Sequence, residues 1–168
     1  MKDLVEKVSS YNLFNYLFPG AIFSMLAGKI TDYKLAPDDL LSALFAYYFI
    51  GLVISRIGSL VVEPILVRAS FLPKSVYRDY VAASKKDPKL ETLVEVSNMY
   101  RTVCAMFLSL MLIKLIEIIE ASVGHGAVMY VGFMVLTALF ALAYRKQSTY
   151  INDRVQANQS RGDGSETK

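Results

Sequence analysis

Residues 40–62 read LLSALFAYYFIGLVISRIGSLVV and contain one charged residue, Arg56. About 20 apolar residues in an α-helix are enough to cross the ~30 Å hydrocarbon core of a bilayer. The stretch follows Pro37, Asp38 and Asp39, which supply an N-cap and negative charge where a helix N-terminus favours them. It therefore predicts a transmembrane helix that begins at Leu40.

The composition of the whole chain also points to a membrane. Its 168 residues are 54% hydrophobic and only 20% charged, and the mean hydropathy is +0.38. A soluble domain is expected to have a mean hydropathy below zero. The apolar content excludes a disordered chain, and the single cysteine excludes a disulfide scaffold and a zinc cluster.

Three further apolar stretches, residues 11–28, 102–121 and 127–144, approach the length of a membrane crossing. We therefore predict an all-α integral membrane protein with four transmembrane helices. Pro19 and Gly20 lie in the middle of the first stretch. Because proline removes a backbone donor and clashes with the preceding turn, we expect a kink or a short break there.

The basic residues are distributed unevenly around these stretches. Fourteen of the 18 Lys and Arg precede the first stretch, lie between the second and third, or follow the fourth. Only Lys29 and Lys34 lie between the first and second. By the positive-inside rule, both termini and the central segment face the cytoplasm.

Four regions follow from this topology: residues 1–65 with the first two spans, a cytoplasmic helical hairpin at 66–100, the last two spans at 101–146, and a polar, disordered tail at 147–168. Asp87 and Pro88 read as an N-cap followed by proline at the first helical position. No proline or glycine then occurs before Gly124. This predicts one helix of about 35 residues that continues from the cytoplasm into the third span.

Two features of the hairpin are candidates for interaction. Leu90, Leu93 and Val94 form an apolar stripe, which packs either on the preceding helix of the same subunit or on another subunit as a stalk. The second feature is a basic cluster, made of Lys85, Lys86 and Lys89. This cluster is either a solvated loop or a site for anionic lipid headgroups, a nucleotide or an acidic partner.

The third span carries two charged residues, Lys114 and Glu117. Charges at helix-centre depth cost about 2.5–3.5 kcal/mol on insertion scales and persist where they are paired or face water. The two residues share a helix face with Phe107 and Leu110. In one interpretation, copies of this face surround a pore, with outer charged rings and a constriction at Phe107 and Leu110. In the other, Lys114 and Glu117 form a buried ion pair or contact polar groups on the first or the fourth span, and so fix the packing.

The first two spans offer further contacts. Arg56 lies about two turns from the cytoplasmic end of the second span, so we expect its side chain to extend to the inner headgroups and to pair with Glu63. Small residues at every fourth position predict close helix packing. They are Gly20, Ser24 and Gly28 in the first span and Gly51, Ser55 and Ser59 in the second.

Catalytic motifs are absent from the sequence, which has no Gly-rich phosphate loop and no HExxH, GxSxG or CxxC pattern. We therefore expect no enzymatic activity, no cofactor and no bound metal. Direct binding of double-stranded nucleic acid is not expected either. The expected partners are membrane lipids and other copies of the chain.

Residues 12–20, NLFNYLFPG, resemble the N-termini of small multi-span membrane proteins found with bacterial anti-phage defence systems. The resemblance implies a bacterial inner-membrane effector that oligomerises and disrupts the membrane when a cytoplasmic sensor protein or a nucleotide signal instructs it. Because such effectors vary widely in sequence, the resemblance assigns no role to individual residues.

The function expected from these features is an oligomeric pore or permeabilising protein, gated through its cytoplasmic helices. Four helices enclose too little volume for a pathway within one subunit, so a pore would lie on a symmetry axis. One alternative is a non-catalytic membrane scaffold or accessory subunit that recruits a cytoplasmic partner. A transporter protomer is a third alternative.

Overall fold

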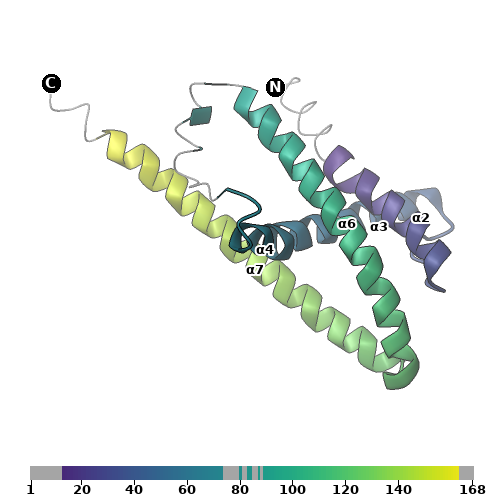
Figure 1. Cartoon of the computed structure of the whole chain (residues 1–168). Helices are drawn as coiled ribbons and strands as arrows, with labels where there is room; N and C mark the ends of the chain where they lie inside the picture. Colours follow the sequence, from purple (N-terminus) through teal and green to yellow (C-terminus); the bar gives the residue numbers. More distant parts are fainter. Residues whose placement is uncertain (1–12, 74–79, 81–82, 85–86, 88, 163–168) are drawn as a thin grey trace.

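A computed structural model describes residues 13–73, 80, 83–84, 87 and 89–162 (Figure 1). Every regular element in these ranges is helical, which confirms the all-α prediction. Among the described residues, three helices are long and apolar enough to cross a membrane: Leu40–Arg68, Lys89–Val123 and His125–Gln156. This is the pattern of a multi-pass membrane protein, with three such helices where the sequence predicts four.

The predicted first span is not among the three helices that are long and apolar enough to cross a membrane. It contains the π-helix η1 (Leu13–Leu17) and the α-helix α2 (Phe18–Ile30). On its own, α2 is about 20 Å long at 1.5 Å per residue, shorter than the bilayer core. The helix continues through Pro19, so the short break does not occur, and a π-helix lies beside the proline. η1 ends at Leu17, and Pro19 lies in the first turn of α2, where proline is tolerated.

The second span is one continuous helix that also contains a π turn next to a proline. α3 (Leu40–Ile57) begins as predicted, and the Asp39 side chain accepts a hydrogen bond from the Ser42 N–H at 2.9 Å. The helix continues through the π-helix η2 (Gly58–Val62) into α4 (Glu63–Arg68), beyond the predicted end. Pro64 lies at the start of α4, so a π turn again precedes a proline.

The third long helix, α6 (Lys89–Val123), has 35 residues and confirms the single helix predicted for this part of the chain. The Asp87 side chain accepts a hydrogen bond from the Lys89 N–H at 3.0 Å, as an N-cap does. The first limb of the predicted cytoplasmic hairpin lies largely outside the described residues.

The last helix, α7 (His125–Gly162), follows a turn at Gly124, whose φ of +92° favours glycine. α7 continues past the predicted end of the fourth span at Tyr144, so residues 147–162 of the predicted disordered tail are helical. The physical reason is that residues 145–161 contain no proline or glycine to end the helix.

The buried core lies where α2, α3 and α6 meet (Figure 1). Its apolar members are Phe23, Ala27, Ile54, Val62, Ala105, Met106 and Leu110. At the crossing of α2 and α3 the backbones touch. A Cβ on Gly20 would lie 1.8 Å from the Tyr47 carbonyl oxygen, and a Cβ on Gly51 would lie 1.8 Å from that of Tyr16. The close packing predicted for these two glycines is confirmed.

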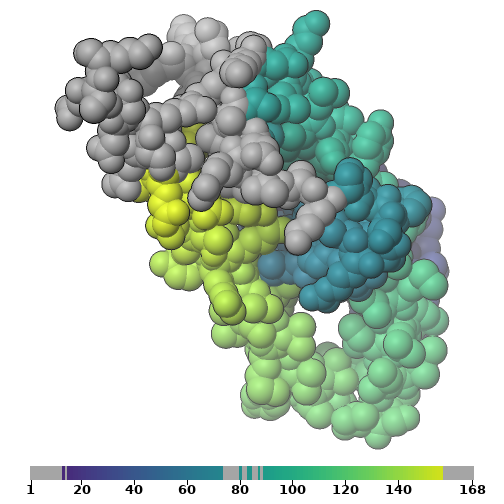
Figure 2. Space-filling model, turned by 60° about the vertical axis from the view of Figure 1, so that its left-hand side comes forward, coloured from purple at the N-terminus to yellow at the C-terminus, as the bar shows by residue number. Residues whose placement is uncertain are grey.

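α7 packs on the rest of the chain far less than the other long helices. Only 6% of its most apolar window is buried, against 28% for α6 and 33% for the second span. Figure 2 shows open space between α6 and α7 near the turn that joins them. Phe140 of α7 stacks on Phe49 of α3 with ring centroids 6.2 Å apart. The chain by itself therefore leaves most of α7 uncovered.

Candidate functional site

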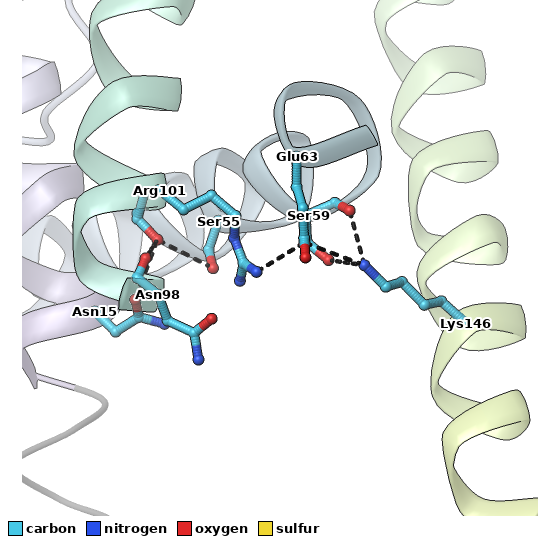
Figure 3. Close-up of polar contacts among 8 residues, drawn as sticks. Asn15, Ser55, Ser59, Glu63, Asn98, Arg101 and Lys146 are labelled. Carbon is cyan, nitrogen blue, oxygen red and sulfur yellow. Dashed lines mark hydrogen bonds and ion pairs between the residues drawn. The ribbon is translucent and has the colours of Figure 1, made fainter. Parts of the chain in front are cut away.

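A polar contact joins three helices at the predicted inner end of the spans (Figure 3). Glu63 of α4 lies between Arg101 of α6 and Lys146 of α7. Its Oε2 accepts a hydrogen bond from Arg101 Nη1 at 2.9 Å and lies 3.4 Å from Lys146 Nζ. All three side chains are at least partly shielded, and the most exposed, that of Glu63, is 36% exposed. One carboxylate oxygen thus serves two cations from different helices.

Lys146 makes further contacts with the second span. Its Nζ donates to the Ser59 backbone oxygen at 2.9 Å and to Ser59 Oγ at 3.0 Å. Together with Glu63 these give three acceptors, which equals the number of N–H donors on an ammonium group. Lys146 Nζ also lies 5.7 Å from the centre of the Tyr150 ring. The charge of Lys146 is therefore fully coordinated by protein groups.

The Ser59 carbonyl is available to Lys146 because of Pro64. At the end of η2 the Glu63 N–H donates to the Gly58 carbonyl, five residues earlier. The next bond in this register would run from residue 64 to the Ser59 carbonyl, but proline has no N–H. A backbone group that is freed inside a membrane span has to find another partner. The Lys146 ammonium is that partner.

A buried polar group adjoins this contact along α6. Thr102 is 0% exposed, and its Oγ1 lies 3.1 Å from Asn15 Oδ1 and 3.5 Å from Ser55 Oγ. The same hydroxyl lies 2.8 Å from the Asn98 carbonyl oxygen. Asn15 and Ser55 are also buried. Because buried polar groups cost free energy unless they are hydrogen-bonded, this cluster fixes how η1, α3 and α6 align.

At the other end of α6, two acidic side chains hold the segment that follows α2. Glu117 Oε1 accepts a hydrogen bond from the Asp32 N–H at 2.6 Å, and its Oε2 pairs with Lys114 Nζ at 2.5 Å. Glu120 accepts a hydrogen bond from the Tyr33 hydroxyl. Glu117 and Glu120 therefore tie the end of α2 to the end of α6.

The bond to Glu120 changes the acidity of Tyr33. It raises the pKa of Tyr33 to about 12, with smaller contributions from desolvation and from the negative charges of Glu120 and Glu117. The neutral phenol is the donor in this bond, so the fold favours the protonated form. Glu120 also pairs with His125, whose side chain is 77% exposed.

The two polar regions lie at opposite ends of the same pair of helices. Asn15 meets Thr102 at one end and Asp32 meets Glu117 at the other, so η1–α2 and α6 run side by side in the same direction (Figure 1). Core residues of α6, among them Leu110, lie between the two ends. This arrangement fixes the relative position of the helices and places charge at both ends of the apolar core.

The four predicted pore-lining residues have different surroundings. Leu110 is 7% exposed and belongs to the core, whereas Phe107 is 55% exposed. Lys114 and Glu117 form an ion pair, with side chains 50% and 19% exposed. The bond from Asp32 to Glu117 favours the interpretation in which the pair contacts polar groups next to the first span. Of the four residues, Phe107 and Lys114 present open surface to another molecule.

The predicted pair of Arg56 and Glu63 does not form. Within the described ranges no ion pair joins the two, and Glu63 pairs with Arg101 and Lys146 instead. In an uninterrupted α-helix, residues seven apart share a face. Here η2 lies between them. Because a π-helix turns less per residue than an α-helix, Glu63 is rotated away from the face of Arg56.

The predicted cytoplasmic interaction residues are partly described. Lys89 is exposed, Leu90 and Val94 are half-buried, and Leu93 is 62% exposed. Lys85 and Lys86 lie outside the described residues. Leu93 is therefore available for contact with another chain.

Sequence patterns alone do not identify the inner contact. In the sequence, Arg101 and Lys146 are two of many basic residues near the ends of spans. The usable signal is Pro64 inside the second helix, because a proline there frees a carbonyl that needs a donor. Lys146 is a suitable donor, since it lies at the predicted inner end of the predicted fourth span.

Among the residues that the structure describes, no group of three or more His, Cys, Asp or Glu side chains could hold a metal ion. Comparison with protein-family models, curated proteins and solved structures finds no match to this chain.

Proposed function

We propose that the chain is a four-span protein of the bacterial inner membrane that assembles into an oligomer and permeabilises the membrane. The observation that carries this proposal is the exposure of α7, of whose apolar window only 6% is buried within one subunit. The space between α6 and α7 (Figure 2) has to be filled in a bilayer. A helix of another copy fills it with better van der Waals packing than lipid chains provide.

The fourth crossing in this proposal is η1 with α2. Together they are about 27 Å long at 1.5 Å per residue, close to the thickness of the bilayer core. They run beside α6 from the level of Thr102 to the level of Glu117. A segment that accompanies a membrane-spanning helix over this length crosses the same layer. The excess of basic residues on one side supports a cytoplasmic location of both termini.

The pathway in the oligomer is lined by the uncovered sides of α6 and α7. Leu110 takes no part in this lining because it lies in the core of the subunit. Phe107 and Lys114 remain candidates, since both are at least half exposed. Lys114 would then place a positive charge near the outer end of the pathway.

The cytoplasmic part of α6 is the element on which a signal acts in this proposal. α6 is one helix from Lys89 to Val123, so a displacement of its cytoplasmic end moves the membrane-spanning part as well. Leu93 offers an exposed apolar contact there. The resemblance of residues 12–20 to defence effectors supports a sensor protein or a nucleotide as the source of the signal.

Flux from liposomes tests the proposal. Purified protein in vesicles of phosphatidylethanolamine and phosphatidylglycerol is expected to release entrapped ions, with a rate that rises more steeply than the first power of the protein-to-lipid ratio. Lys114→Gln should shift the preference toward cations, because it removes a positive charge from the pathway. Lys34→Gln is the matched control, since Lys34 is exposed outside the spans.

Two results would count against this function. The first is the absence of ion release from vesicles that contain folded, inserted protein, both with and without cytoplasmic extract from the host. This result would rule out permeation. Equal selectivity of the wild type and Lys114→Gln would remove Lys114 from the pathway.

The second candidate is a non-catalytic membrane scaffold or accessory subunit that recruits a cytoplasmic partner. The ion pairs favour it, because the charges of Lys114, Arg101 and Lys146 are engaged within one subunit, as in a purely structural role. A scaffold would bind its partner or its own copies through the exposed surfaces while the vesicles stay tight. The flux experiment therefore separates the two functions.

A further inference from the structure

The attachment of α7 to the rest of the subunit depends on few side chains, namely the stack of Phe140 on Phe49 and polar contacts toward its two ends. At its outer end α7 follows the Gly124 turn, and His125 pairs with Glu120. Toward its inner end Lys146 reaches Ser59 and Glu63 on the second span. Between these ends most of α7 is exposed. A change at Lys146 therefore affects the position of the whole inner half of α7.

The charged partner of Lys146 tolerates its departure. Glu63 remains paired with Arg101 through a contact of 2.9 Å, so it is not left as an isolated charge. The Ser59 carbonyl loses a donor that Pro64 cannot replace, and this lost bond favours the closed position of Lys146. Lys146 itself can extend along its apolar stem to the phosphates of the inner headgroups. Both positions of the ammonium are thus satisfied, which is what a two-state element requires.

We propose that Lys146 is a latch that holds the inner half of α7 on the second span, at the Ser59 carbonyl, and that α7 moves away about the Gly124 turn when this latch opens. In the closed state the ammonium binds the Ser59 carbonyl, the Ser59 hydroxyl and Glu63. In the open state it binds lipid phosphate. The connection between latch opening and permeation rests on the proposed function, whereas the latch itself does not.

Distance measurements between spin labels test the latch directly. Labels are placed at Ser97→Cys on α6 and Ser148→Cys on α7, two exposed positions, in a Cys104→Ser background. Double electron–electron resonance is recorded in nanodiscs of phosphatidylethanolamine and phosphatidylglycerol. We expect one narrow distance distribution for the otherwise wild-type chain. Lys146→Gln should shift this distribution to longer distances and broaden it.

The neighbouring residue provides a matched control. Arg145 is exposed and makes no ion pair within the described ranges, so Arg145→Gln removes the same charge without opening the latch. A second pair of labels, at Ser42→Cys and Ser122→Cys near the outer end, reports on the rest of the subunit and should not change. A shift in Arg145→Gln as large as that in Lys146→Gln would overturn the latch.

Pro64→Ala tests the same idea without removing a charge. It gives residue 64 an N–H, which competes with Lys146 for the Ser59 carbonyl, so we expect a smaller shift in the same direction. If Lys146→Gln does not fold, the distances measured in Pro64→Ala still test the latch. Unchanged distances in Pro64→Ala and in any folded Lys146→Gln would reject the latch. A shifted distance with unchanged ion flux would keep the latch and reject its link to permeation.

Discussion

Gly20 and Gly51 lie against each other where α2 crosses α3, and a Cβ on Gly20 would be 2.8 Å from the Gly51 backbone nitrogen. Such a distance is too short for a methyl group. The first two predicted spans are therefore packed backbone to backbone, and any side chain at this point forces them apart.

The first prediction is that Gly51→Ala destabilises the subunit. Its new Cβ would lie 1.8 Å from the Tyr16 carbonyl oxygen. Overpacking typically costs about 1–3 kcal/mol and sometimes more. The measurement is unfolding in increasing mole fractions of dodecyl sulfate. Gly132→Ala in α7 is the control, because open space surrounds its Cβ and alanine is the better helix former. Equal midpoints for both variants would contradict the backbone contact.

The second prediction concerns the buried hydroxyl of Thr102. Thr102→Val keeps the shape but leaves Asn15 and Ser55 without this partner, which should cost about 1–3 kcal/mol. The control is Thr137→Val on α7. Thr137 also lies near the carbonyl four residues earlier, at 2.8 Å, but it is exposed. The same unfolding assay should show a clear loss for Thr102→Val and almost none for Thr137→Val. A larger loss of stability for Thr137→Val than for Thr102→Val would contradict the role of Thr102 in the buried polar cluster.

Some of these features could be predicted from the sequence because local signals determine them. Asp39 and Asp87 cap helices as their positions before apolar runs suggest. The absence of proline and glycine after Pro88 gives α6 its length. Spacing alone predicts the pair of Lys114 and Glu117, since residues three apart on a helix are neighbours.

Other features depend on the placement of several helices and could not be predicted. The burial of Leu110 follows from the packing of α2 and α3 on one side of α6, which periodicity in an apolar helix does not reveal. Glu63 meets Arg101 and Lys146 because η2 changes the helical phase after Arg56. α7 continues into a polar segment, where apolar periodicity gives no signal.

The third prediction follows from the pKa of Tyr33, which is raised from 10.0 to about 12. Because the folded state favours the protonated phenol, the contribution of this group to stability is complete below pH 10 and is lost as the pH rises through about 12. In an absorbance titration at the phenolate band, Tyr33 should contribute a step near pH 12, and Tyr33→Phe should remove this contribution. Tyr144→Phe, at an exposed position, should leave it unchanged. Loss of this contribution in Tyr144→Phe instead would contradict the assignment.

The fourth prediction concerns the N-terminal end of α6, which the sequence predicts to be cytoplasmic. If Leu93, which is 62% exposed, contacts another copy, then Leu93→Asp should reduce the number of associated subunits and leave membrane insertion intact. Thr92→Asp introduces the same charge at the preceding exposed position and should have a smaller effect. Size-exclusion chromatography with light scattering measures both variants. An unchanged subunit number for Leu93→Asp would assign the apolar stripe to packing within one subunit.

The number of subunits in a lipid environment tests the central claim most directly. Protein extracted with its surrounding lipid by a copolymer can be weighed by native mass spectrometry without detergent. Because most of α7 is uncovered in one copy, we expect a defined complex of several copies. A single copy at every protein concentration, from folded and inserted protein, would contradict the assembly from which the proposed function follows.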